Sequence, residues 1–133
     1  MTTQEFITFN GKDEDGVGCI AVHPSRKHIA IAEKGKNPNI YIYEYPSFRL
    51  YRILTKGTET MYSHCEFSTS GDKLCSVGGY PDYTLTVWDW LAERVILKAK
   101  AFGTEVYRAS FSPFSEDILF TVGSTHMKFW KMA

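Results

Sequence analysis

Cysteine and histidine side chains are the residues of this 133-residue chain that most suggest chemistry, because thiolates and imidazoles are common ligands of zinc. The candidates are Cys19, Cys65, Cys75, His23 and His64. Zinc ligands usually occur as Cys-x-x-Cys or His-x-x-x-His pairs, and these five residues are not spaced in that way. Cys65 also lies two residues before Phe67, so both would point to one face of a strand. The pattern predicts no metal site and makes Cys65 a small core residue.

Catalysis would need side chains held within reach of one another, and no such pattern is found. Residues 13–15 are three adjacent carboxylates near glycines, which is typical of a solvated loop, and they lack EF-hand spacing. Three serines fall in predicted turns without a Gly-x-Ser-x-Gly elbow: Ser68, Ser70 and Ser112. The glycine pair 78–79 is not part of a phosphate-binding loop. We therefore expect no enzyme activity and no cofactor.

The elements that must position these residues recur three times along the chain. An apolar residue before a turn recurs at intervals of 45 and 44 residues, and an aromatic residue at intervals of 45 and 42. The positions are Val22, Phe67 and Phe111 for the first series and Tyr43, Trp88 and Trp130 for the second. A period near 44 residues predicts a repeat architecture. The functional question becomes one of partners rather than of reactions.

Short β-branched or alternating runs between turn residues predict four strands in each of the first two repeats and three in the last. The expected strands are 17–23, 29–32, 40–45, 50–54, 62–67, 73–77, 84–88, 94–98, 106–111, 118–122 and 127–131. Residues 91–100 could also be read as a helix, although an exposed edge strand fits them equally well.

Antiparallel four-stranded units of this length predict an all-β fold, an incomplete β-propeller with two four-stranded blades plus a partial third. The expected divisions are 1–16 for an N-terminal segment, 17–56 for blade 1, 57–102 for blade 2 and 103–133 for the incomplete blade 3. Residues 4–10 could add an outer strand.

The second repeat resembles the blade of a WD-repeat protein. Trp88-Asp89 matches the signature dipeptide, and Asp82 lies six residues before Trp88, where the family has a tight-turn aspartate. Ser76 lies twelve residues before Trp88, in the family's serine or threonine position. The family's Gly-His pair is replaced by Gly-Thr, so the resemblance implies blades held by an incomplete hydrogen-bonded tetrad. Tyr43 and Trp130 are the corresponding structural residues of the other two repeats.

A narrower resemblance covers nearly the whole chain. The segments 20–24, 32–35, 42–47, 81–88 and 128–132 are similar to the WD-repeat cilia- and flagella-associated proteins. This resemblance implies a non-catalytic scaffold in the ciliary or flagellar axoneme, linked to dynein-arm tethering and cilium motility. The implied partners are other axonemal proteins, namely dynein-arm tether components and tubulin. The implied location is the cytoplasm, the cytoskeleton and the axoneme.

Two predicted loops are the expected partner contacts. Lys34, Lys36 and Asn37 lie in one locally basic loop, and Tyr80 and Tyr83 lie in another. Loops between strands commonly carry binding residues, although many are simply solvated.

An aromatic run could stack nucleic-acid bases. It comprises Tyr41, Tyr43, Tyr45, Phe48 and Tyr51. Alternation would place the first three on one sheet face, where packing between blades demands bulky residues. The chain has 15 basic and 15 acidic residues, so it lacks the basic excess that attracts nucleic acid. Core packing is the favoured interpretation, and nucleic acid is not an expected partner.

Membrane insertion is not expected either, because no stretch approaches the roughly 20 apolar residues of a span. Three cysteines without a secretory signal favour a reducing compartment.

The predicted ring is incomplete, so the first and last blades would each expose an apolar face. We expect the chain to be a fragment or short isoform of a longer protein's N-terminal propeller region, prone to aggregate alone. An alternative function is a WD-repeat adaptor outside cilia, in trafficking or ubiquitin-ligase substrate recruitment.

Overall fold

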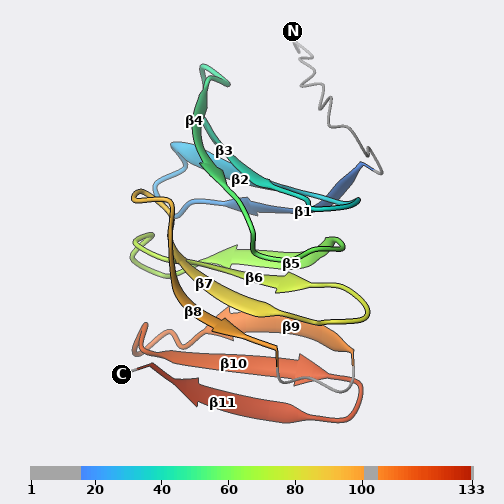
Figure 1. Cartoon of the computed structure of the whole chain (residues 1–133). Coiled ribbons are helices and arrows are strands. Elements are labelled where there is room, and N and C mark those ends of the chain that lie inside the picture. Colours follow the sequence, from blue (N-terminus) through green and yellow to red (C-terminus); the bar gives the residue numbers. More distant parts are fainter. Residues whose placement is uncertain (1–15, 101–104, 133) are drawn as a thin grey trace, which may run out of the picture.

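The computed structural model describes residues 16–100 and 105–132, which form three antiparallel sheets (Figure 1). The first sheet consists of β1 (Val17–Val22), β2 (His28–Glu33), β3 (Ile40–Glu44) and β4 (Leu50–Leu54). The second consists of β5 (Tyr62–Phe67), β6 (Leu74–Gly78), β7 (Leu85–Asp89) and β8 (Arg94–Ala99). The third consists of β9 (Val106–Phe111), β10 (Ile118–Gly123) and β11 (Met127–Lys131). Strands adjacent in sequence are neighbours in every sheet.

This arrangement confirms the predicted all-β, incomplete propeller, in which the ring of blades is not closed. Figure 1 shows the sheets lying one beside the next in chain order. The first strands of the blades meet, since β1 packs against β5 and β5 packs against β9.

The segment that could have been helical forms an edge strand, β8. A turn precedes it, in which the Glu93 backbone N–H donates to the Trp90 carbonyl over 3.2 Å. Glu93 has a φ of 54°, so the chain reverses there and Arg94 pairs with Asp89. Val95 and Ile96 stay exposed at this edge.

Two apolar layers fill the spaces between the sheets. The layer between the first and second sheets is formed by Ala21, Ala30, Ala32, Ile40, Ile42, Leu54, Tyr62, Cys65, Phe67, Leu74, Trp88 and Trp90. The layer between the second and third sheets is formed by Cys75, Val77, Leu85, Val87, Val106, Ala109, Phe111 and Leu119. The second sheet therefore buries both of its faces, while each of the others buries one.

The prediction that the tyrosines of β3 fill a space between blades is wrong for this structure. Ile40 and Ile42 are fully buried against the second sheet. Alternation along β3 turns Tyr41 and Tyr43 to the opposite face, where both are only half-buried. Tyr45 follows the strand and is 51% exposed. Alternation predicted a shared face correctly, but it could not tell which face the second sheet covers.

Both ends of the stack present apolar faces. Strand register places eight residues on the free side of the first sheet, here called the first outer face: Ile20, Val22, Ile29, Ile31, Tyr41, Tyr43, Leu50 and Ile53. The free side of the third sheet, here called the second outer face, carries Phe120, Val122, Met127 and Phe129. Ile20 and Val22 are each 59% exposed, and Phe129 is 66% exposed.

Candidate partner-binding groove

A tryptophan–hydroxyl hydrogen bond recurs in the second and third sheets, and it is fully buried in the second. The indole Nε1–H of Trp88 donates to Ser76 Oγ over 3.0 Å, and both residues are almost fully buried. In the third sheet, Trp130 Nε1–H donates to Thr121 Oγ1 over 2.9 Å. In both sheets the hydroxyl residue lies two positions beyond the tryptophan's partner on the neighbouring strand. This bond ties the third strand of a blade to the second.

The first sheet has no equivalent of this bond. Register pairs Tyr43 with Ile29, so Ile31 occupies the position of Ser76. Burial raises the pKa of the Tyr43 phenol above its ordinary value. The first blade thus lacks the hydroxyl acceptor that the second strand supplies in the other two blades.

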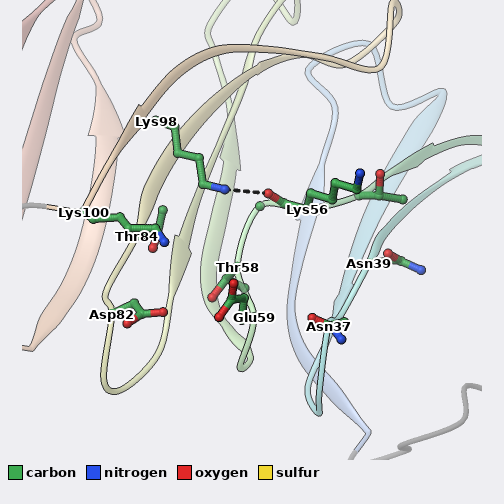
Figure 2. Close-up of a pocket in the computed structure, with 11 residues that line it drawn as sticks. Asn37, Asn39, Lys56, Thr58, Glu59, Asp82, Thr84, Lys98 and Lys100 are labelled. Atoms are coloured by element: carbon green, nitrogen blue, oxygen red, sulfur yellow. Dashed lines mark hydrogen bonds between the residues drawn. The ribbon is translucent and has the colours of Figure 1, made fainter.

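The loops at one end of the first two sheets enclose a groove of about 550 Å³, shown in Figure 2. Three connections and the end of β8 supply its walls. The lining residues are Asn37, Asn39, Thr55, Lys56, Gly57, Thr58, Glu59, Asp82, Thr84, Lys98 and Lys100.

Two hydrogen bonds fix the shape of the groove. Lys98 Nζ donates to the backbone carbonyl of Lys56 over 2.8 Å, which joins β8 to the β4–β5 connection (Figure 2). The Asn37 backbone N–H donates to the Glu59 carbonyl over 3.0 Å, which joins the β2–β3 loop to the same connection. The two blades therefore hold the groove together from both sides.

At Gly57 the β4–β5 connection lies directly against the buried Trp88 side chain. A Cβ added at Gly57 would collide with the Tyr62 hydroxyl and lie 2.7 Å from Trp88 Cζ2. Thr86 Oγ1 donates to the Gly57 carbonyl over 3.4 Å. The core around Trp88 therefore supports the floor of the groove.

Five charged side chains line the groove: Lys56, Lys98, Lys100, Glu59 and Asp82. Within residues 16–100 and 105–132 none of the five takes part in an ion pair. A polar groove with unpaired charges of both signs suits the polar segments of a protein partner better than an apolar small molecule.

The structure brings together only part of the predicted contact set. Of the five predicted contact residues, Asn37 lines the groove. Asp82, predicted as a tight-turn aspartate, lines the groove from the other blade. Lys34 and Lys36 are exposed in the same loop as Asn37 but do not line it. Tyr80 is 76% exposed, and its ring centroid lies 6.3 Å from that of Tyr83.

Asp89 lies at the other end of β7, away from the groove. Its Oδ2 forms an ion pair with Arg94 at 3.0 Å. Sequence reasoning missed Lys56, Lys98 and Glu59 as groove residues. No local signal could have found them, because only the packing of two blades brings them together.

The candidate zinc ligands separate into different environments. Cys19 and Cys65 approach to 3.1 Å between their sulfurs, but Cys75 lies in the other apolar layer. His23 and His64 each bond to a backbone carbonyl of the next blade. The described part of the chain contains no group of three or more His, Cys, Asp or Glu residues that could hold a metal ion.

The three serines act within their own turns. Ser68, Ser70 and Ser112 each accept a backbone N–H hydrogen bond from a residue a few positions later. The carboxylates of residues 13–15 and the possible outer strand at 4–10 lie outside the described residues. No helix long and apolar enough to cross a membrane occurs in the residues that the structure describes.

Antiparallel sheets packed face to face, with a recurring tryptophan–hydroxyl bond, define an incomplete WD-repeat β-propeller. The chain belongs to the WD-repeat cilia- and flagella-associated protein family, on the strength of this fold and of its relatives. It is 49% identical over 127 residues to Cilia- and flagella-associated protein 44 of Mus musculus, and 46% identical over 130 residues to that of Chlamydomonas reinhardtii. The alignments cover 96% and 92% of this chain. These relatives confirm the predicted resemblance and the predicted ciliary or flagellar location.

Another relative, less similar in sequence, is named as a microtubule-associated protein. The chain is 32% identical over 129 residues to Echinoderm microtubule-associated protein-like 1 of Homo sapiens, an alignment that covers 89% of this chain and 16% of the relative. The chain spans only 7% of the length of the mouse and Chlamydomonas relatives.

A family model described as Ribosomal protein L3 also matches, over residues 5–98. This match conflicts with the relatives and with the fold. It ends inside β8 and omits the third sheet, although that sheet repeats the tryptophan–hydroxyl bond of the second. The formal net charge of zero also lacks the basic excess with which proteins bind nucleic-acid phosphates. We therefore assign the family from the blades and the relatives.

Proposed function

We propose that this chain is a non-catalytic protein-binding module of the ciliary or flagellar axoneme, and that the groove is its contact site. One observation carries the proposal. Loops from two blades, which the sequence singles out as partner contacts, converge on a groove with five charged side chains outside any ion pair of the described residues. The names of the relatives supply the cellular setting.

The charges of the groove indicate the chemistry of the partner segment. Three lysines and two acidic residues line the groove, so a partner segment rich in carboxylates meets more attractive than repulsive charges there. Dynein-arm tether components are the proposed partners, which would link the chain to cilium motility. Tubulin is a second candidate, favoured by the relative named as microtubule-associated.

Capture from axonemal extract tests the proposal. Residues 1–133, immobilised, should retain dynein-arm tether components or tubulin, identified by mass spectrometry. Lys56→Glu reverses one charge of the groove while leaving the Lys56 carbonyl free to bond Lys98, and should weaken capture about tenfold.

Lys131→Glu is the matched control, because this exposed lysine on β11 carries the same charge change outside the groove. Equal loss of capture in both variants would argue against the groove. Capture of vesicle-coat or ubiquitin-ligase subunits in place of axonemal proteins would favour the adaptor alternative.

A further inference from the structure

Two cysteine thiols meet where the first blade packs on the second. The Cys19 thiol on β1 donates to Cys65 Sγ on β5, with 3.1 Å between the sulfurs. The two residues are 46 positions apart in the chain, so the contact joins separate blades. The predicted role of Cys65 as a small core residue is consistent with its place in the first apolar layer, but the contact with Cys19 gives the pair a further property.

The backbones of β1 and β5 approach unusually closely beside this pair. A Cβ added at Gly18, the neighbour of Cys19, would collide with the backbone carbonyl of Tyr62 on β5. The absence of a side chain at Gly18 therefore allows the two strands to bring their sulfurs together. Closing 3.1 Å to the roughly 2.05 Å of a disulfide requires a movement of about 1 Å.

We infer that Cys19 and Cys65 form a reversible disulfide that fastens the first blade to the second when the protein meets a low-molecular-weight disulfide such as oxidised glutathione. Thiol pairs in reducing compartments typically form such bonds transiently, as responses to oxidation. The third cysteine, Cys75, is excluded because it faces the opposite apolar layer.

The exposure of the two sulfurs sets the order of the steps. Cys19 is half-buried, whereas Cys65 is 4% exposed, so the oxidant reaches Cys19 first. The Cys19 thiolate attacks one sulfur of the oxidised glutathione, whose S–S bond breaks and releases one glutathione thiolate. Cys65 then gives up its proton and attacks Cys19 Sγ, which releases the second glutathione. Two protein thiols are oxidised, one glutathione disulfide is reduced, and the two protons end on the two glutathione thiols.

The second step is the slow one. The contact with Cys19 and burial raise the pKa of the Cys65 thiol, so little thiolate is present there. Proximity compensates, because the attacking sulfur already lies against its target.

The test is oxidation of residues 1–133 in native buffer with oxidised glutathione, followed by alkylation and tryptic digestion without reduction. We expect a cross-linked species that joins peptide 13–26 to peptide 57–73, two hydrogens lighter than the sum of the free peptides. Reduction should separate it. The cross-linked protein should also unfold about 5 °C or more above the reduced protein, because the bond closes a long loop.

Cysteine variants and a denatured sample complete the test. Cys19→Ser and Cys65→Ser should each abolish the cross-link, while Cys75→Ser should retain it. The same oxidation in urea should scatter the pairing and give Cys65–Cys75 bonds, since these residues are close in sequence. Native pairing that includes Cys75, persistent glutathione adducts without a cross-link, bonds only between separate chains, or an unchanged unfolding temperature would each overturn the inference.

Discussion

Trp88 connects the core of the second blade to the surface that we propose for binding. Its indole N–H is satisfied by Ser76 deep in the sheet, and the edge of its ring lies under Gly57 at the groove floor. A buried aromatic side chain that supports a loop transmits any loss of packing to that loop. Changes at this residue should therefore affect both the free energy of unfolding and the shape of the groove.

Substitutions at this pair should separate packing from hydrogen bonding. Trp88→Ala removes a side chain that is 1% exposed and should lower the free energy of unfolding by about 3–5 kcal/mol. Ser76→Ala leaves the indole N–H without its acceptor and should cost about 1–3 kcal/mol. Denaturant unfolding of both variants checks these values. Phe114→Ala, at a residue 97% exposed, should change stability by less than about 0.5 kcal/mol. A Trp88→Ala protein as stable as the parent would contradict the blade assignment.

At the scale of elements, a cluster of rings joins the first two blades. His28, at the start of β2, lies 5.2 Å from the Trp90 ring and 5.0 Å from the Tyr51 ring, centroid to centroid. The His23 ring lies 5.0 Å from the Phe67 ring of β5. Three strands and two turns thus meet in this cluster of rings.

Stability should therefore depend on pH through this cluster. Burial, with repulsion from His23, lowers the pKa of His28 below its ordinary value of 6.5; Lys27 and Arg52 act in the same direction, and Glu44 opposes them. His28 therefore becomes protonated near pH 6.5 in the unfolded chain but only at a lower pH in the folded protein. The free energy of unfolding should fall as the pH decreases below about 6.5.

Thermal unfolding at pH values from about 7.5 to 5.5 measures this effect. His28→Leu keeps an apolar side chain in the cluster and should lose part of the pH dependence. A parent and variant with the same slope would show that His28 does not carry the effect.

Elements were predictable here because turn residues separate them clearly. Prolines, glycines and polar runs mark nearly every strand end, and β5, β9 and β11 begin and end where the sequence places them. Alternation also grouped Tyr41 and Tyr43 on one face. Which face lies against another sheet depends on neighbouring blades, and this information is not contained in one strand. The groove required the same long-range knowledge, since Lys56 and Lys98 lie 42 positions apart.

The stack of sheets formed by the described residues has two unlike outer faces, and both are apolar. A closed propeller would cover each with a neighbouring blade. Exposed apolar patches of this kind drive association. In solution we expect association of residues 1–133 that grows with protein concentration.

Charged substitutions on these faces should reduce that association. Ile20→Lys and Phe129→Lys each place an ammonium group at a position that is more than half exposed, so neither should unfold the chain. Light scattering over a concentration series checks the result. Leu91→Lys, at a 47% exposed residue outside both faces, is the matched control and should associate like the parent. Equal association of all three variants would show that the outer faces do not mediate it.

The register of the sheets gives this stack a polarity. The first outer face consists of the same strand positions as the face of the second sheet that packs against the first sheet. The second outer face consists of the same strand positions as the face of the second sheet that packs against the third sheet. Copies that join the first outer face of one to the second outer face of the next add head to tail. If the rotation from one copy to the next divides a full turn, the assembly closes on itself and growth stops. If it does not, the same contact produces an open fibre.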